Sequence, residues 1–512
     1  MTMRLIMTAI VALTASTTLA AVRPIRIFTN NMVLPRGKPV PVWGRATPGE
    51  KVTVSYSGKT ATATTGEDGR FEAVLPALAV EKTGKDLTIV GANRVVCTNV
   101  VVGDVWLVSG QSNAEMQFRW GIIDGEAEMK KSSAYPNVRQ LKFDHVVSAF
   151  VLRDDSANVH KQWVVCNEET LPYVSAMGYF FARDINMRTG IPIGILDDNW
   201  AGCAIEPFIN EEGLGMVPEF SAGIRHAAGS RRRTVEWAHR VVECEKAGDF
   251  GGVGFAPPLP DWGRQYNAMI APLTRFPIAG ALWYQGCANG DEGIEYKRKL
   301  EALIGGWRKA WGCDFPFYIV QLAAFTRKTT DPAGGNGYAR IRNAMRIAAQ
   351  TIPNTGIAVA IDIGNATDHH PKNKRDVGER LARWARRDVY GEKDLVVSGP
   401  LFKGMKVEGT KARLSFDHVG SGLMAGERDP DTPGEAPTPT PDGRLRGFAV
   451  AGADKKWHWA DAVIDGADVV VFSKEVGVPV AVRYAHRANP MGDCNLYNRE
   501  GLPASPFRTD DW

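Results

Sequence analysis

The sequence lacks several features that would each point to a class of function. No Cys-x-x-Cys pair occurs, so the cysteines predict no metal site. Their odd count leaves at least one thiol free even if one or two disulfides form. The seven cysteines are Cys97, Cys166, Cys203, Cys244, Cys287, Cys313 and Cys494.

The net charge of +4 is small for 512 residues, and we expect the one dense basic run, Arg231–Arg233, on a solvated helix face. No nucleic-acid partner is therefore predicted.

No segment reaches the roughly 20 consecutive apolar residues of a membrane-spanning helix, so no membrane partner is predicted. The N-terminus has a shorter apolar stretch, Leu5–Leu13, which follows Arg4 and leads to small residues with a Thr18-x-Ala20 cleavage signal. We interpret residues 1–20 as a signal peptide. The mature chain is expected to be an exported soluble protein, secreted or periplasmic, and the pattern makes no prediction about its oligomeric state.

Three regions follow the predicted signal peptide. Residues 21–101 consist of short alternating runs between Gly, Asp and Pro turns, which predicts a small β-sandwich. Residues 102–392 alternate apolar runs with helical stretches, the pattern of βαβ units and a mainly parallel sheet. Residues 393–512 return to short strands around a Pro-rich loop and predict a β-rich C-terminal domain. The predicted fold class is α/β with two β-rich flanks.

The central region is expected to contain four main helices, near residues 175–188, 294–311, 338–350 and 374–388. The segment 206–261 is rich in Gly, Pro and charge and breaks the alternation, so we predict an irregular insertion or lid there. Ligands of parallel sheets bind at the carboxyl ends of the strands. The residues that follow the predicted strands are therefore the first candidates for a site.

Four strand ends carry small or polar residues: Gly110–Asn113, Trp200–Cys203, Gln285–Asn289 and Asp368–Pro371. Such loops, converging at one edge of a sheet, could supply the groups that acyl transfer requires. These groups are a nucleophile, a base, an acid that orients the base, and donors for an oxyanion.

Ser112 is the candidate nucleophile, because a serine hydroxyl at a strand end needs only a nearby imidazole to become reactive. Either His369 or His370 fits as that imidazole, and Asp368 fits the third role of a triad.

The oxyanion hole has its own candidates. Backbone amides at Ser112 and Gly202 fit as donors, and a side-chain amide from Gln285 or Asn289 would complete the hole.

Each candidate residue could instead have a purely structural role. Ser112 is as readily a helix N-cap, Gly202 a turn glycine, and the side-chain amides partners of loop backbone. Asp368 would cap a helix that Pro371 opens. No Gly-x-Ser-x-Gly elbow occurs, so spacing alone supports serine hydrolysis weakly.

A metal is the remaining alternative at the histidine pair. The adjacent His369 and His370 with Asp362 nearby suggest an ion, but ring nitrogens of neighbouring residues rarely converge on one metal. We predict neither a metal nor an organic cofactor.

Longer stretches run in order along nearly the whole mature chain and carry a resemblance to a known family. They are MVLPRGKPVPVWGRATPGEKVTV, GDVWLVSGQSN, IPIGILDDNWAGCAIEPF, YNAMIAPL, ALWYQGCAN, DHHPKNKRDVGERLA, VAVRYAHRANP and LYNREGLPASPFRTDDW. Together they resemble the sialate O-acetylesterase family of the SGNH hydrolase superfamily. The resemblance implies an SGNH-hydrolase-like (flavodoxin-like) three-layer α/β/α domain within residues 102–392.

The resemblance also implies roles for individual residues. Ser112 in GQSN would be the nucleophile, and His370 rather than His369 in DHHP would be the base. Gly202 would donate to the oxyanion, with Gln285 as side-chain donor and Asn289 close by.

The acid that orients His370 stays open. The superfamily spaces its acid three residues before the histidine, whereas Asp368 stands two residues before His370. Asp368, Asp362 or a backbone carbonyl would orient the ring.

Four residues depart from the usual pattern of the relatives. Ala114, Ala201, Cys287 and His369 stand where relatives usually have Met, Gly, Glu and an aliphatic residue.

The expected function is an exported carbohydrate O-acetylesterase that forms an acyl-enzyme on Ser112. Its acetylated carbohydrate substrate would be sialic acid or a plant glycan such as xylan. The alternative is a carbohydrate-binding protein whose catalytic site has decayed, a role that two β-rich flanks and 14 tryptophans would suit. Retention of Ser112, His370 and Gln285 argues against this alternative.

Overall fold

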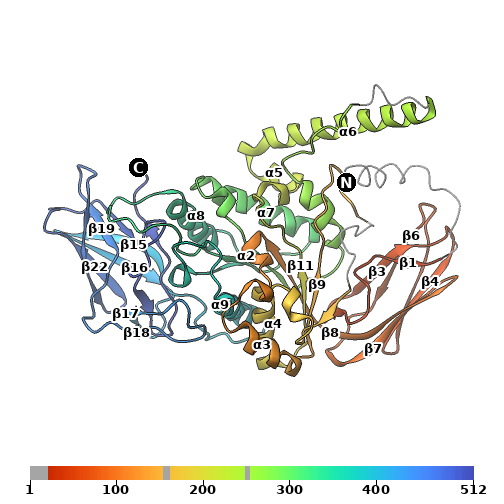
Figure 1. Cartoon of the computed structure of the whole chain (residues 1–512), viewed down its shortest axis with the longest axis horizontal. Coiled ribbons are helices and arrows are strands. Elements are labelled where there is room, and N and C mark those ends of the chain that lie inside the picture. The colour runs from red at the N-terminus through yellow and green to blue at the C-terminus, as the bar shows by residue number, and fades with distance from the viewer. Residues whose placement is uncertain (1–20, 154–161, 248–253) are drawn as a thin grey trace.

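The computed structural model describes residues 21–153, 162–247 and 254–512. The predicted signal peptide, residues 1–20, lies outside the described residues. Figure 1 shows an elongated molecule in which a central α/β body lies between an N-terminal and a C-terminal β-rich region. None of the helices in the described ranges has both the length and the apolar character of a transmembrane segment.

The central sheet is built on one long strand, β8 (Arg94–Gly110). Its order along one path is β10-β9-β11-β8-β12-β13-β14; neighbours from β9 to β14 pair in parallel, and β10 pairs antiparallel at the edge. The other strands are β9 (Val138–Lys142), β10 (Val164–Val165), β11 (Ile193–Asp197), β12 (Gly280–Tyr284), β13 (Phe317–Val320) and β14 (Thr355–Ala358). Every residue of β11, β12 and β13 is buried, as expected for strands covered on both faces. The predicted α/β class is confirmed.

Helices cover both faces of this sheet. They are α4 (Ala176–Thr189), α7 (Glu295–Trp311), α8 (Gly337–Thr351) and α9 (Lys374–Asp388), each within one residue of its predicted bounds. Phe317 of β13 packs against Trp307 of α7, whereas the next residue, Tyr318, packs against Trp384 of α9. Because consecutive strand residues point to opposite faces, α7 and α9 lie on opposite sides of the sheet. Helix α8 contacts α7, and α4 contacts α9, which completes the two helical layers.

The N-terminal region shares β8 with the central sheet. Strands β2 (Val33–Pro35), β4 (Lys51–Tyr56), β5 (Lys59–Thr64) and β7 (Glu81–Val90) join the 11-stranded sheet through pairings with β8 or with one another. Strands β1 (Arg23–Pro24), β3 (Val40–Arg45) and β6 (Arg70–Leu75) form a separate three-stranded sheet. The boundary predicted between residues 101 and 102 therefore falls inside a continuous strand.

The C-terminal region consists of short antiparallel strands. They include β15 (Leu401–Glu408), β16 (Lys411–Asp417), β17 (Leu423–Glu427), β18 (Thr438–Pro439), β19 (Phe448–Ala451), β20 (Trp457–Trp459), β21 (Asp461–Asp465), β22 (Asp468–Phe472), β23 (Ala481–Tyr484), β24 (Leu496–Asn498) and β25 (Phe507–Arg508). Buried Arg342 of α8 fastens this region to the central body. Its guanidinium donates to the carbonyls of Leu322, Ala323, Arg487 and Ala488. All seven cysteines lie in the described residues and are unpaired.

The segment 206–261 differs from its prediction. It contains α5 (Glu211–Met216) and α6 (Ser221–Ala247), the long helix at the top of Figure 1. The buried residues of α6 recur at helical spacing along one stripe; they are Gly223, Ala227, Ser230, Trp237 and Val241. The first three are small, so the stripe carries little apolar signal in the sequence. The expectation of an irregular segment was therefore wrong for residues 221–247.

Candidate active site

The side chains of Ser112 and His370 meet at the carboxyl end of the central sheet. Ser112 is the first residue of the short helix α2 (Ser112–Glu115), which directly follows β8. Its Oγ lies 2.8 Å from Nε2 of His370, a residue 258 positions later in the chain. Ser112 is 9% exposed and the His370 side chain 26% exposed, so the pair lies at the protein surface, partly open to solvent.

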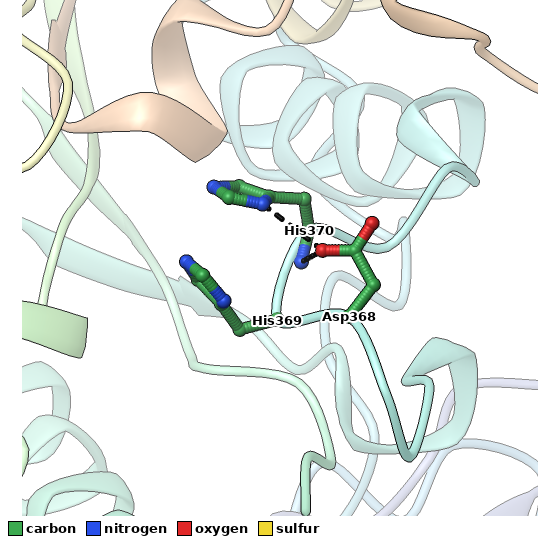
Figure 2. Close-up of side chains that lie close together, drawn as sticks. All are labelled: Asp368, His369 and His370. Carbon is green, nitrogen blue, oxygen red and sulfur yellow. Dashed lines mark hydrogen bonds and ion pairs between the residues drawn. The ribbon is translucent and has the colours of Figure 1, made fainter.

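Asp368 holds the opposite side of the His370 ring. Its Oδ1 accepts the His370 backbone N–H at 2.8 Å and lies 3.0 Å from Nδ1 of the ring, as Figure 2 shows. A proton on Nδ1 satisfies the second contact and leaves the lone pair of Nε2 directed at Ser112. The carboxylate of Asp362 instead pairs with Arg380 through two contacts of 2.7 Å. Of the two candidate acids, Asp368 is the one in contact with His370.

The surroundings of His370 and Asp368 set the protonation states of both side chains. Burial and the neighbouring His369 lower the pKa of His370 below 6.5, although the hydrogen bond to Asp368 works in the opposite direction. Burial opposes ionisation of Asp368, but hydrogen bonds from His370 and the charge of Lys372 outweigh it and lower the pKa of the carboxyl. At neutral pH the imidazole is thus neutral and the carboxylate ionised, as a general base and its orienting acid require.

The turn that carries Ser112 depends on a glycine and a glutamine. Gly110 has a φ of +136°, and a Cβ there would lie 2.3 Å from the carbonyl oxygen of Tyr284. The Gln111 N–H donates to that same carbonyl at 3.0 Å, and the Gln111 side-chain oxygen accepts the Gly286 N–H at 3.1 Å. These contacts lock the serine turn onto the end of β12.

The loop after β11 is fastened beside this turn. The Trp200 N–H donates to the Gly110 carbonyl at 3.0 Å, and the Ala201 N–H donates to the carboxylate of Glu115 at 2.9 Å. The next residue, Gly202, has a φ of +74° and no atom within 4 Å of the place where a Cβ would sit. Among the described residues, the backbone N–H groups of Gly202 and Ser112 have no hydrogen-bond partner. Both are available to a ligand.

Gln285 and Asn289 lie beneath this loop. The Gln285 amide donates to the Cys203 carbonyl at 3.2 Å and to the Asn289 side-chain oxygen at 2.8 Å. The Asn289 amide in turn donates to the carboxylates of Glu206 and Glu292. The structure thus brings both predicted donors to the site, with their amide hydrogens already directed at protein acceptors.

A bridge between the two catalytic loops was missed in the sequence. The Asn113 amide donates to the His369 carbonyl at 2.9 Å, and its oxygen accepts from Nζ of Lys374 at 2.6 Å. Because Asn113 follows Ser112 and His369 precedes His370, the bridge runs parallel to the serine–imidazole contact. The available signal was a lysine four residues after His370, at the start of the predicted helix.

Lys374 is unusual for a lysine. It is fully buried, and its Nζ lies 5.1 Å from the centre of the Tyr284 ring. Burial lowers the pKa of Lys374 to about 7, with a smaller contribution from the charge of Lys372.

The residues around His370 do not fit a resident metal. Asp368, His369 and His370 each place one ligand atom within 4.8 Å of the others. However, Asp368 and His370 already bond each other, and Nε2 of His370 is engaged with Ser112. A cation bound there would compete with the contacts that prepare the serine.

An α/β fold with a serine–histidine–aspartate series at the carboxyl end of its sheet is an arrangement that can hydrolyse esters. The family described as carbohydrate esterase, sialic acid-specific acetylesterase, matches residues 102–387, and the chain belongs to this family. The resemblance drawn from the sequence is thereby confirmed.

Similarity extends along most of the chain. The chain is 26% identical to human (Homo sapiens) sialate O-acetylesterase, and the alignment covers 94% of this chain and 91% of that protein. The mouse (Mus musculus) sialate O-acetylesterase is also 26% identical, covering 91% of this chain and 90% of its own length. The crystal structure of a carbohydrate acetylesterase from Xanthomonas citri is 35% identical and superposes with a TM-score of 0.79. That match covers 96% of this chain and 100% of the other.

Proposed function

We propose that the protein is an exported carbohydrate O-acetylesterase in which Ser112 is the nucleophile, His370 the base and Asp368 the orienting acid. The observation that carries this proposal is the continuous series from Ser112 Oγ to His370 Nε2 at 2.8 Å and from His370 Nδ1 to Asp368 at 3.0 Å. Family membership supplies the acetylated carbohydrate as substrate class. The predicted signal peptide supports export, and the strand order supports an SGNH-like domain between two β-rich domains.

The reaction begins when Nε2 of His370 accepts the proton of Ser112 and Oγ attacks the acetyl carbonyl. The resulting oxyanion accepts the backbone N–H groups of Ser112 and Gly202. As the tetrahedral intermediate collapses, the imidazolium donates its proton to the sugar oxygen, and the deacetylated sugar leaves. Water then attacks the acetyl-serine by the same route, with His370 as its base, and releases acetate.

Gln285 and Asn289 support the oxyanion hole in this proposal. The Gln285 amide donates to the Cys203 carbonyl and to the Asn289 side-chain oxygen, and the Asn289 amide donates to Glu206 and Glu292; these contacts fix the loop that presents Gly202. Direct donation to the oxyanion, as the sequence suggested, would require one of these amide hydrogens to leave its present partner.

The alternative of a decayed binding protein is less well supported. Loss of catalysis would allow Ser112, His370 and Asp368 to change, and here all three are present and make every contact of the proposed triad. The choice between sialic acid and a plant glycan belongs to the same proposal. Comparing acetate release from acetylated sialic acid, acetylated xylan and acetylated xyloglucan fragments would identify the substrate.

The test of the mechanism is Ser112→Ala, with acetate release from p-nitrophenyl acetate as readout. We expect a loss of about 10³-fold or more, as for other serine hydrolases that lose their nucleophile. Ser109→Ala is the matched control, because this buried hydroxyl stands in β8 and has no partner within the described residues. A Ser112→Ala protein with the wild-type rate would overturn the proposal.

A further inference from the structure

A second cavity lies in the C-terminal region, away from Ser112. It has a volume of about 290 Å³ and is bordered by the start of β19, the end of β20 and the start of β21. Trp459, the last residue of β20, lines it and is 41% exposed. We call this hollow the Trp459 cavity.

The indole of Trp459 is held in a fixed position. Its N–H donates to the Thr330 carbonyl at 3.1 Å, and the guanidinium of Arg487 lies 4.8 Å from the ring centre. Arg487 is not among the residues that line the cavity. A rigid, exposed aromatic face is a platform on which the C–H face of a sugar ring can stack.

The polar residues around the platform suit hydroxyl groups. Arg444 pairs with Asp461 at 3.1 Å, and Arg446 lies 3.6 Å from Asp442. Each pair offers a donor and an acceptor side by side, and adjacent sugar hydroxyls both donate and accept. The lining contains three carboxylates and two guanidinium groups, so it carries no excess of positive charge for an anionic sugar. The chemistry fits a neutral carbohydrate.

A short chain segment runs from the Trp459 cavity toward the catalytic end of the sheet. A larger cavity of about 410 Å³ is lined by Ala288 and Thr326, and the Ala288 N–H contacts Gln111, the neighbour of Ser112. Thr326 is four residues from Thr330, whose carbonyl holds Trp459. Four residues span at most about 14 Å. Residues of this one short segment therefore line the larger cavity and hold the tryptophan of the Trp459 cavity.

We propose that the Trp459 cavity is a second carbohydrate-binding site, which holds a neutral glycan a few sugar units from the acetyl group under attack. Binding of the glycan in the Trp459 cavity does not depend on catalysis. Only the position of the glycan relative to the acetyl group rests on the proposed function.

The test is calorimetric titration of the full-length protein with xylohexaose and cellohexaose, which carry no acetyl groups. We expect one or both to bind, and Trp459→Ala to weaken the binding by at least about tenfold, as for a well-packed aromatic anchor. Trp512→Ala is the matched control, since Trp512 is 39% exposed in the same region and does not line the cavity. A second variant, Asp461→Ala, removes the carboxylate partner of Arg444 and should also weaken binding.

Activity on p-nitrophenyl acetate separates this proposal from the catalytic one. Trp459→Ala should keep the wild-type rate on this small ester, which also shows that it folds. No binding of either oligosaccharide, equal binding by Trp459→Ala and wild type, or tighter binding of polysialic acid would each overturn the proposal. Retained activity in Ser112→Ala would overturn the catalytic mechanism and leave the binding result intact.

Discussion

Replacing Lys374 by Met tests how the two catalytic loops are held together. The ammonium donates to the Asn113 side-chain oxygen at 2.6 Å, and the amide of that residue donates to the His369 carbonyl at 2.9 Å. Methionine is similar in length and apolar, so it fills the buried space and removes only the donor and the charge. The Asn113 oxygen then has no partner among the described residues, and the amide loses the contact that orients it.

The expected effect on stability is small, because two contributions oppose each other. A hydrogen bond from a charged group stabilises by about 1.5–3 kcal/mol, and Lys374→Met loses it. Burying the ammonium costs free energy, as its pKa of about 7 shows, and Met avoids that cost. The main effect is therefore expected in catalysis.

Two kinetic changes follow. A shift of about 1 Å between reacting groups can slow a reaction about 10²-fold, so we expect kcat to fall about 10- to 100-fold with little change in KM. The charge of Lys374 also lowers the pKa of His370. Its removal raises that pKa, so the acidic limb of the pH profile should move to higher pH.

The assay is p-nitrophenyl acetate hydrolysis from mildly acidic to mildly basic pH. Lys372→Met is the matched control, because Lys372 is 39% exposed and lies 3.4 Å from Asp368. An exposed ion pair is worth about 0–1 kcal/mol, so this control should change kcat at most a few fold. Wild-type kcat and an unmoved acidic limb in Lys374→Met would refute the role of the bridge.

Further outcomes are expected from the same geometry. Asp368→Asn removes the anion that orients His370, and kcat should fall by up to about 10⁴-fold; an unchanged rate would point to another orienting group. Gly202→Ala meets no steric clash but must adopt a φ of +74°, so urea unfolding should show a loss of about 1–2 kcal/mol. Folded Lys374 holds its proton less tightly than unfolded Lys374, so the stability of wild type relative to Lys374→Met should rise between about pH 7 and pH 10.5. A flat difference across that range would contradict the lowered pKa.

The elements found from the sequence share a strong local pattern. Helices α7, α8 and α9 are amphipathic, whereas α4 contains a continuous buried run, Ala176–Ile185; all four lie within one residue of their predicted bounds. Strand β9 was missed because its sequence, VRQLK, mixes polar and apolar residues; burial of Arg139 and Gln140 comes from tertiary partners.

The site shows a similar division. The sequence identified the motifs of Ser112, Asp368 and His370, and the structure brings these three residues into contact. It did not show where the Gln285 amide points, because its partner Cys203 lies in a loop from another strand. The Lys374 bridge was missed for the same reason, since Asn113 and His369 become neighbours only in the folded chain.

The continuity of β8 has a mechanical consequence. The N-terminal part of this strand pairs antiparallel with β7. Its C-terminal part lies between β11 and β12 and ends at Gly110, two residues before Ser112. A force applied to the N-terminal region would be transmitted along the continuous backbone of β8 to the turn that carries Ser112. Cutting the chain at residue 102 would divide β8 and interrupt its pairing with β2, which spans Val101 to Gly103. The N-terminal region and the turn that carries Ser112 therefore share one strand, β8.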